Sequence, residues 1–259
     1  MDSRTFAVYA LAAAFTLQSA PGRAGCEVSS GPKTAALVEL YTSEGCSSCP
    51  PADRQLSHLR EILDPVADVV PLALHVSYWD YIGWKDPFAQ SASGDRHKRL
   101  AHANGLRTVY TPQFFVGGSD LRSSGRALRD EVSRINGTAA TASIQLRAGA
   151  SHSGSLTVNA EATARGGAGP AALYLAITES GLVSKVARGE NGGATLRHDH
   201  VVREWIGPIR LSGGAVRVQR EIALPPAWNP ARLEVAAFVQ DERTGAVLQA
   251  VRAEQCAAS

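Results

Sequence analysis

Two cysteines three residues apart, Cys46 and Cys49, divide an apolar run from a helix-like segment. The run ALVELYTS, residues 36–43, is typical of a buried strand. The segment after the cysteines, PPADRQLSHLREIL, places its leucines on one helical face and confines its prolines to the first turn, where a missing N–H costs nothing. The sequence therefore predicts that the pair lies where a strand ends and a helix begins, which is the start of an α/β arrangement.

Strand-like and helix-like segments keep alternating through residues 25–138. They predict an α/β domain with a central mixed sheet flanked by helices. An aromatic stretch, YWDYIGWKDPF, is inserted between two of them. The further predicted elements are strands at 69–76 and from residue 113, and helices from Asp86 to about His102 and from Leu121 to Ile135.

The pattern changes after about residue 139. Short alternating runs such as SIQLRA, SLTVNAEAT, ALYLAIT and RLEVAAFVQ follow one another, separated by Gly, Pro or Asn turns. This alternation is typical of an antiparallel β-sandwich or barrel. We therefore expect two domains, residues 25–138 and a β-sandwich at residues 139–259.

Composition narrows the class of protein. With 44% hydrophobic and 19% charged residues among 259, the chain has the composition of a globular protein rather than a disordered one. Its formal net charge is +2, which is too small to imply a nucleic-acid partner. A folded protein without nucleic acid as its partner is expected.

Residues 1–24 carry the features of a secretory signal peptide. Arg4 precedes an apolar run from Phe6 to Leu17, and small residues suit cleavage after Ala24. A periplasmic or secreted protein is then expected. The alternatives are an uncleaved anchor, although the run is shorter than the ~20 residues that span a bilayer, and a lipoprotein site at Cys26. No later segment predicts a stable membrane span.

The chain contains four cysteines, and export would place all of them in an oxidising compartment. Cys46 and Cys49 are near neighbours, which leaves Cys26 and Cys256 to pair with each other. Their bridge would close almost the whole mature chain, and loop-entropy models give such a bridge a stabilisation on the order of 4–5 kcal/mol. A structural disulfide between Cys26 and Cys256 is therefore predicted.

The position of Cys46 and Cys49 favours thiol–disulfide exchange. The N–H groups and dipole of a helix start stabilise a thiolate at Cys46, and Cys49 lies within reach to resolve a mixed disulfide. Pro112 follows Thr111 at the start of a strand, where an X-Pro bond can be cis and press against the sulfurs. Glu39, inside an apolar strand, is the candidate acceptor for the Cys49 proton.

The order of these elements is similar to the thioredoxin fold. The segments VELYTSEGCSSCPPAD, HVSYWDYIGWKDPFA and YTPQFFVGG resemble a secreted thioredoxin-like bacterial family that is still catalogued as a domain of unknown function. This resemblance implies that Cys46 is the nucleophile, Cys49 the resolving cysteine and Pro112 the cis-proline. The Ser47-Ser48 interior differs from the Gly-Pro interior of reducing thioredoxins, so the direction of exchange stays open.

Other interpretations of the cysteine pair remain. It can be a plain local disulfide, or a copper site of the kind found in thioredoxin-like copper chaperones, with Cys46, Cys49 and His75 as ligands. Zinc is less favoured, because no second cysteine pair or close histidine pair has the usual spacing. The exchange hypothesis needs no organic cofactor, and its partners would be proteins that contain thiols or disulfides, or small thiols.

Several further polar and aromatic residues have two interpretations each. Trp79, Tyr81, Trp84 and Thr111 either line a groove for an unfolded partner or pack the inserted segment onto the sheet. His198 and His200 are expected on one face of a strand, in hydrogen-bonding roles rather than as metal ligands. The basic run Arg96 to Arg99 is expected to be a solvated helix face.

Overall fold

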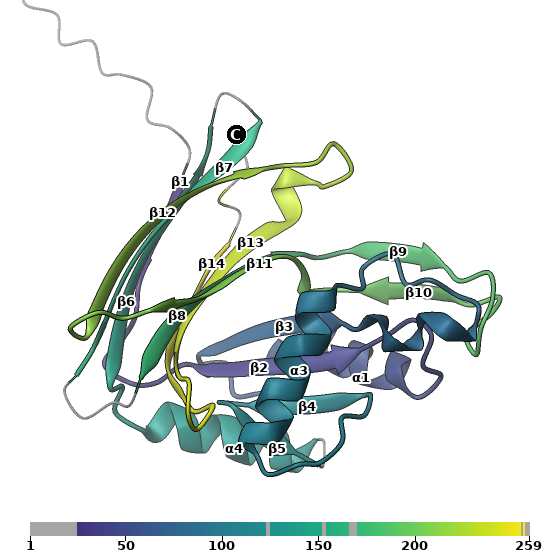
Figure 1. Ribbon diagram of the computed structural model, residues 1–259, viewed down its shortest axis with the longest axis horizontal. Helices are drawn as coiled ribbons and strands as arrows, with labels where there is room; N and C mark the ends of the chain where they lie inside the picture. The colour runs from purple at the N-terminus through teal and green to yellow at the C-terminus, as the bar shows by residue number, and fades with distance from the viewer. Residues whose placement is uncertain (1–24, 123–124, 152–153, 166–169, 255, 257–259) are drawn as a thin grey trace, which may run out of the picture.

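The computed structural model describes residues 25–122, 125–151, 154–165, 170–254 and 256 (Figure 1). The predicted signal peptide, residues 1–24, lies outside the described residues. Within the described part of the chain, no helix is long and apolar enough to cross a membrane.

The regular elements alternate between strands and helices at first and are then almost all strands. In chain order they are β1 (Gly25–Ser29), β2 (Ala36–Thr42), α1 (Cys49–Ser57), α2 (Leu59–Ile62), β3 (Val69–His75), the 3₁₀ helix η1 (Ser77–Ile82), α3 (Ser91–Ala103), β4 (Gln113–Val116), β5 (Ser119–Leu121), α4 (Arg126–Gly137), β6 (Ala142–Ala150), β7 (Ser155–Ala164), β8 (Ala171–Glu179), β9 (Leu182–Lys185), β10 (Thr195–His198), β11 (Val201–Arg210), β12 (Ala215–Ala223), the 3₁₀ helix η2 (Pro230–Arg232), β13 (Leu233–Asp241) and β14 (Val247–Glu254).

One eight-stranded sheet contains strands from both halves of the chain, in the order β14-β13-β8-β11-β3-β2-β4-β5. β2 is parallel to β3 and antiparallel to β4. β11 joins the two halves, because it pairs in parallel with β3, through Val201 and Ala73, and in antiparallel orientation with β8. Every residue of β2, β3 and β8 is buried, as expected for strands that are covered on both faces.

The predicted fold, a helix-flanked thioredoxin-like α/β domain followed by an antiparallel β-sandwich domain, is wrong for this protein. The described chain is mostly β, and β2, β3, β4 and β5 belong to the same sheet as β8, β11, β13 and β14. The physical reason is that β3 pairs with a strand that comes far later in the chain, and such long-range pairing leaves no trace in local periodicity. The domain boundary near residue 138 stays a prediction.

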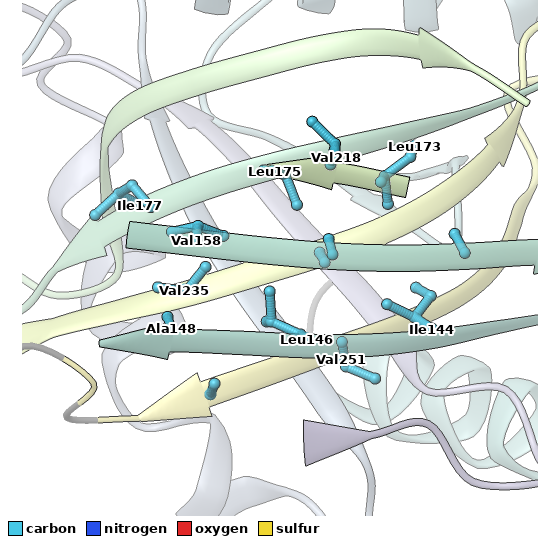
Figure 2. Close-up of a cluster of buried hydrophobic side chains, with 14 of the residues drawn as sticks. Ile144, Leu146, Ala148, Val158, Leu173, Leu175, Ile177, Val218, Val235 and Val251 are labelled. Atoms are coloured by element: carbon cyan, nitrogen blue, oxygen red, sulfur yellow. The ribbon is translucent and has the colours of Figure 1, made fainter. Parts of the chain in front are cut away.

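A sandwich-like arrangement forms the other part of the molecule. A four-stranded sheet, in the order β1-β6-β7-β12, packs on β8, β13 and β14 (Figure 1). Side chains of β6 alternate between buried and exposed, so Ile144 and Leu146 point into the core between the sheets, as Figure 2 shows. Burying one such side chain contributes roughly 1.5–3 kcal/mol relative to leaving it exposed.

The side chains of β2 face two different layers. Tyr41 lies in a core that includes Leu100 of α3. Leu40, pointing the opposite way, lies in a core with Leu56 of α1 and Val132 of α4. This alternation decides which polar residues near the carboxyl end of β2 meet the cysteine pair and which meet α3.

Two predicted helices begin later than expected. α3 starts at Ser91 rather than at Asp86: the Asp86 carboxylate accepts hydrogen bonds from the N–H groups of Phe88 and Glu44, but only a short turn follows it. The next helix starts at Arg126, because Leu121 belongs to β5.

Candidate functional site

Cys46 and Cys49 form a disulfide at the start of α1. The helix begins at Cys49 itself, so Cys46 lies in the turn before it, where its carbonyl accepts a hydrogen bond of 3.1 Å from the Cys49 N–H. Pro50 and Pro51 occupy the first turn, as expected for residues without an N–H to donate. Both cysteines are buried, with exposed fractions of 1% and 0%, whereas Ser47 is exposed.

The loop between β9 and β10, residues 186–194, lies on the turn that carries the disulfide, and we call it the cover loop. The Asn191 side-chain amide donates to the carbonyl oxygens of Glu44 and Cys46, at 2.8 and 3.0 Å. In the opposite direction, the Ser47 N–H donates to the Glu190 carboxylate at 2.9 Å. A hydrogen bond from the Ser47 side chain, together with this one from its N–H, lowers the pKa of Glu190. A segment far along the chain therefore contacts the backbone of the disulfide turn directly.

Five titratable side chains are buried beside this turn, and we call them the acid–histidine cluster: Glu44, Asp53, His75, Asp86 and His198. His75 Nδ1 lies 2.7 Å from Asp86 Oδ2, and His198 Nε2 lies 3.0 Å from Glu44 Oε1. The other oxygen of Glu44 accepts a hydrogen bond of 2.8 Å from Trp84 Nε1. The cluster joins the disulfide turn, α1, the end of β3 and β10.

Some polar atoms of the acid–histidine cluster have no hydrogen-bond partner. His75 Nε2, His198 Nδ1 and Asp53 Oδ1 are buried and have no hydrogen-bond partner. His198 Nδ1 is 3.9 Å from Asp53 Oδ2, which is beyond hydrogen-bond distance. Buried polar atoms without partners are uncommon in folded proteins and are found more often at functional sites than elsewhere.

Burial and charge act in opposite directions on the pKa values of this cluster. Burial raises the pKa of Asp53, and the neighbouring His75 and His198 offset part of that rise. Burial alone would lower the pKa of His75, but the Asp86 carboxylate overcomes it and raises that pKa. The same contact lowers the pKa of Asp86 although burial opposes it. The contact between His75 and Asp86 therefore favours the charged form of each group.

The predicted proton acceptor, Glu39, is engaged elsewhere. Both of its carboxylate oxygens accept hydrogen bonds from Arg96 of α3, at 2.6 and 2.9 Å. The Arg96 guanidinium in turn lies over the rings of Tyr174, Trp205 and Phe238, with its central carbon 4.7 to 5.1 Å from their centroids. Glu39 shares the α3 side of β2 with Tyr41, not the side that α1 covers.

The basic run Arg96 to Arg99 is only partly a solvated face, because Arg96 and His97 are buried while Lys98 and Arg99 are exposed. Arg96 is held by its ion pair with Glu39, and His97 stacks on Tyr41 with 4.0 Å between ring centroids. Helical periodicity explains the division, since adjacent residues of a helix point in different directions.

Of the residues predicted to form a partner groove, some make hydrogen bonds inside the protein and one is exposed. Trp79 Nε1 donates to Thr111 Oγ1 at 2.7 Å, and Trp84 binds Glu44, so both indoles are used inside the protein. Tyr81 is 82% exposed. The Thr111–Pro112 peptide bond, directly before β4, is cis. Trp79 also lies against the disulfide turn, because a Cβ placed on Gly45 would be 3.0 Å from its Cβ.

The remaining predicted residues lie away from this site or differ from expectation. The structure pairs Cys26 of β1 with Cys256 near the end of the chain. His198 and His200 do not share a strand face, since β10 ends at His198 and His200 has a φ of 56°. Among the described residues, no group of three or more His, Cys, Asp or Glu side chains converges as a metal site, and copper binding by Cys46, Cys49 and His75 stays an untested alternative.

Several residues of the site were not predicted from the sequence: Asp53, Asp86, Glu190 and Asn191. Asp53 had a usable signal, because it follows Cys49 by four residues and so lies on the same helical face. Glu190 and Asn191 had none, since only the tertiary fold brings the cover loop to the disulfide turn.

Two solved structures resemble the fold. The X-ray structure of a structural-genomics target protein from Agrobacterium tumefaciens matches with a TM-score of 0.61 and 23% identity, over 86% of this chain and 95% of that one. HBP35 of Porphyromonas gingivalis matches with a TM-score of 0.67 and 17% identity, over 86% of this chain and 76% of that one. At these identities the likeness concerns the fold alone. No protein with a curated description matches the chain significantly.

A comparison with protein families gives a match over residues 37–240, which contain the disulfide turn, the acid–histidine cluster and the cover loop but neither Cys26 nor Cys256. Because this match spans most of the chain, the protein belongs to DUF1223, a family described as proteins of unknown function.

Proposed function

We propose that this protein exchanges disulfides with thiol-containing partners through Cys46 and Cys49. The observation that carries the proposal is the disulfide at the first residue of α1, beside buried titratable side chains of which three each have one polar atom without a hydrogen-bond partner. The N–H groups of a helix start favour the thiolate that exchange requires. No organic cofactor is needed, because the two sulfurs carry the electron pair.

The proposed reaction conserves thiols and disulfides. A partner thiolate attacks Cys46 Sγ, the Cys46–Cys49 bond breaks, and Cys49 leaves as a thiolate that takes up a proton. A second thiol of the partner then attacks the mixed disulfide, so that Cys46 is released and the partner leaves oxidised by two electrons. The reverse sequence reduces a partner disulfide, and the reduction potential of the couple decides the direction.

We favour Asp53 over Glu39 for handling the proton of Cys49. Asp53 lies one helical turn after Cys49 on α1, and burial raises its pKa, which suits a group that takes up and releases a proton. Glu39 is held by Arg96 on the other side of β2. Pro112 is proposed to position the partner backbone, in the role that the sequence resemblance implies.

The two disulfides support a location in an oxidising compartment, the periplasm or the exterior, because such bonds are rare in reducing cytosol. Proteins that contain thiols or disulfides, and small thiols, are the proposed partners. The four-stranded sheet lies apart from the Cys46–Cys49 disulfide, and we propose that it supports the site or helps to select these partners.

A second candidate function, a purely structural disulfide, is favoured by one observation: both cysteines are buried, at 1% and 0% exposed. The two candidates differ in what a single cysteine variant does. A structural disulfide contributes stability only, whereas an exchange couple forms mixed disulfides when its resolving cysteine is missing.

The test is dithiothreitol-driven reduction of insulin by the mature protein and its cysteine variants. Cys46→Ser is expected to abolish turnover, and Cys49→Ser to accumulate mixed disulfides that appear on non-reducing gels. Cys26→Ser/Cys256→Ser is the matched control, because it removes the other disulfide and leaves the couple intact. Turnover by Cys46→Ser at the rate of the unaltered protein would contradict the proposal.

A further inference from the structure

The cover loop is bound to the disulfide turn mainly through backbone groups of that turn. The three hydrogen bonds use the carbonyl oxygens of Glu44 and Cys46 and the N–H of Ser47. On the cover loop they use only the side chains of Glu190 and Asn191. The contact is therefore polar, and another molecule that offers one donor and one acceptor can replace two of its three hydrogen bonds.

The cover loop also contacts the aromatic segment that follows β3. A Cβ placed on Gly189, which has a φ of 76°, would lie 3.3 Å from both Ile82 Cδ1 and Trp84 Cβ. The loop is thus in contact with η1 and its following turn on one side and with the disulfide turn on the other. Its anchor is β10, where His198 binds Glu44.

Thiol–disulfide exchange at Cys46 requires a segment that covers this buried cysteine to move. A thiolate attacks a disulfide sulfur directly, so the rate depends on access to that sulfur. Cys46 is 1% exposed although the next residue, Ser47, is exposed. The cover loop is held on the turn by polar contacts, and its residues Arg188, Gly189 and Glu190 are exposed.

We propose that Glu190 and Asn191 are specificity-determining residues that keep small thiols from Cys46 and yield to an extended polypeptide. The Cys46 carbonyl and the Ser47 N–H belong to one trans peptide group and point in opposite directions. A polypeptide has an N–H and a C=O at each residue, so it can donate to the first group and accept from the second through different residues. A small thiol such as N-acetylcysteine has a single amide and does not reach both groups. The partner class is therefore a cysteine-containing polypeptide segment, and this inference rests on the proposed exchange function.

The experiment compares two thiols in reaction with the oxidised full-length mature protein. One is N-acetylcysteine and the other is an unstructured peptide of ten residues with one central cysteine and blocked ends. Rate constants for opening the Cys46–Cys49 bond are measured by stopped-flow tryptophan fluorescence and by acid-quenched thiol trapping. In the unaltered protein the peptide is expected to react at least ~10-fold faster than N-acetylcysteine, after correction for the thiol pKa of each reagent.

The decisive variant is Glu190→Ala/Asn191→Ala. N-acetylcysteine is expected to react at least ~10-fold faster with it than with the unaltered protein, so that the preference for the peptide falls toward one. Arg188→Ala is the matched control, because Arg188 lies exposed in the same loop and takes no part in the hydrogen bonds described above to residues 44–47. It is expected to leave both rates unchanged. Unchanged rates in the double variant would overturn the proposal.

Failure of the cover-loop proposal and failure of the exchange proposal give different results. Unchanged rates in the double variant, together with normal insulin turnover by the unaltered protein, overturn the cover loop alone. The other result is faster opening of the Cys46–Cys49 bond by N-acetylcysteine in the double variant, with no insulin turnover by the unaltered protein or the variant. It would support a shielding role for the cover loop but overturn both the polypeptide partner class and the exchange function.

Hydrogen exchange supplies a second measurement that needs no variant. If the cover loop opens locally, the Ser47 amide, which is bonded to Glu190, exchanges much faster than the amide of Leu40 in the buried strand β2. Exchange of both amides at the same slow rate, set by global unfolding, would overturn the proposal.

Discussion

Two groups of buried charged side chains lie beside β2, and they differ in how completely their hydrogen bonds are satisfied. Glu39 and Arg96 form a two-point ion pair, and Gln240 accepts a further bond from Arg96 at 3.1 Å. On the side that α1 covers, the acid–histidine cluster leaves atoms of Asp53, His75 and His198 without partners. We call the first group closed, because its charged atoms have hydrogen-bond partners. We call the second group open, because some of its polar atoms can still bind a proton, a water molecule or a partner.

This difference separates a structural role from a functional one. A closed buried network fixes packing, and Arg96 does so by joining α3 to the rings of Tyr174, Trp205 and Phe238 on β8, β11 and β13. An open network costs stability and is retained where chemistry needs it. The open cluster lies next to the disulfide, and the closed one does not.

The largest expected effect comes from breaking the closed pair. Arg96→Met removes the partner of a carboxylate that is 0% exposed, and the free energy of unfolding is expected to fall by about 3–5 kcal/mol. Urea unfolding of the oxidised protein measures it. The Glu39→Gln/Arg96→Met double variant, which leaves no buried charge, is expected to recover part of the loss, and a loss below about 1 kcal/mol in Arg96→Met would contradict the structural role.

The next largest effect is a pH dependence of the free energy of unfolding, caused by His97 on the α3 side of β2. Burial lowers the pKa of His97 to about 4, although its hydrogen bond to Gln113 opposes the shift. Between about pH 6.5 and pH 4 the unfolded chain binds a proton that the folded protein does not, so stability falls as pH falls through this window, by up to about 3 kcal/mol. Urea unfolding at several pH values is expected to show a flatter profile for His97→Gln, and identical slopes would contradict the shift.

His75, on the open side, is expected to behave in the opposite way. The Asp86 carboxylate raises its pKa above the usual value, so its stabilisation is fully present below about pH 6.5 and is lost as pH rises through the raised folded value. The Cε1 proton of His75, followed by NMR, is expected to titrate above the ordinary histidine value of about 6.5. A pKa for His75 below that value would contradict the stabilisation of its charged form by Asp86.

The smallest expected effect is a gain in stability. The raised pKa of Asp53 means that its ionised form at neutral pH disfavours the fold, so Asp53→Asn is expected to stabilise the oxidised protein by up to about 1 kcal/mol. The same variant is expected to slow insulin reduction, because Cys49 loses its proton acceptor. Unchanged turnover would remove Asp53 from the proposed mechanism, and Glu61→Gln, at an exposed site on the following helix, is the matched control.

The sequence predicted the local features of the site and missed the tertiary ones. The strand before Cys46 and the helix that starts at Cys49 followed from periodicity and from the prolines. A carboxylate inside an apolar strand correctly indicated that Glu39 is buried, but its partner Arg96 was assigned to a solvated face because a run of four basic residues hides the helical phase.

What the sequence did not predict depends on pairing between distant segments. The joining strand β11 pairs with both β3 and β8, so strands from both halves of the chain share one eight-stranded sheet. The same long-range contacts bring His198 and Asn191 to the disulfide turn. Neither residue lies in a local motif, so only the fold identifies it.

The equilibrium reduction potential of Cys46–Cys49 tests the central claim most directly. It is measured by trapping free thiols in graded glutathione buffers, in the Cys26→Ser/Cys256→Ser variant so that one couple alone responds. The exchange proposal predicts a value between roughly −270 and −120 mV, the span of known exchange proteins. A value below roughly −300 mV would mark a structural disulfide and contradict the proposal.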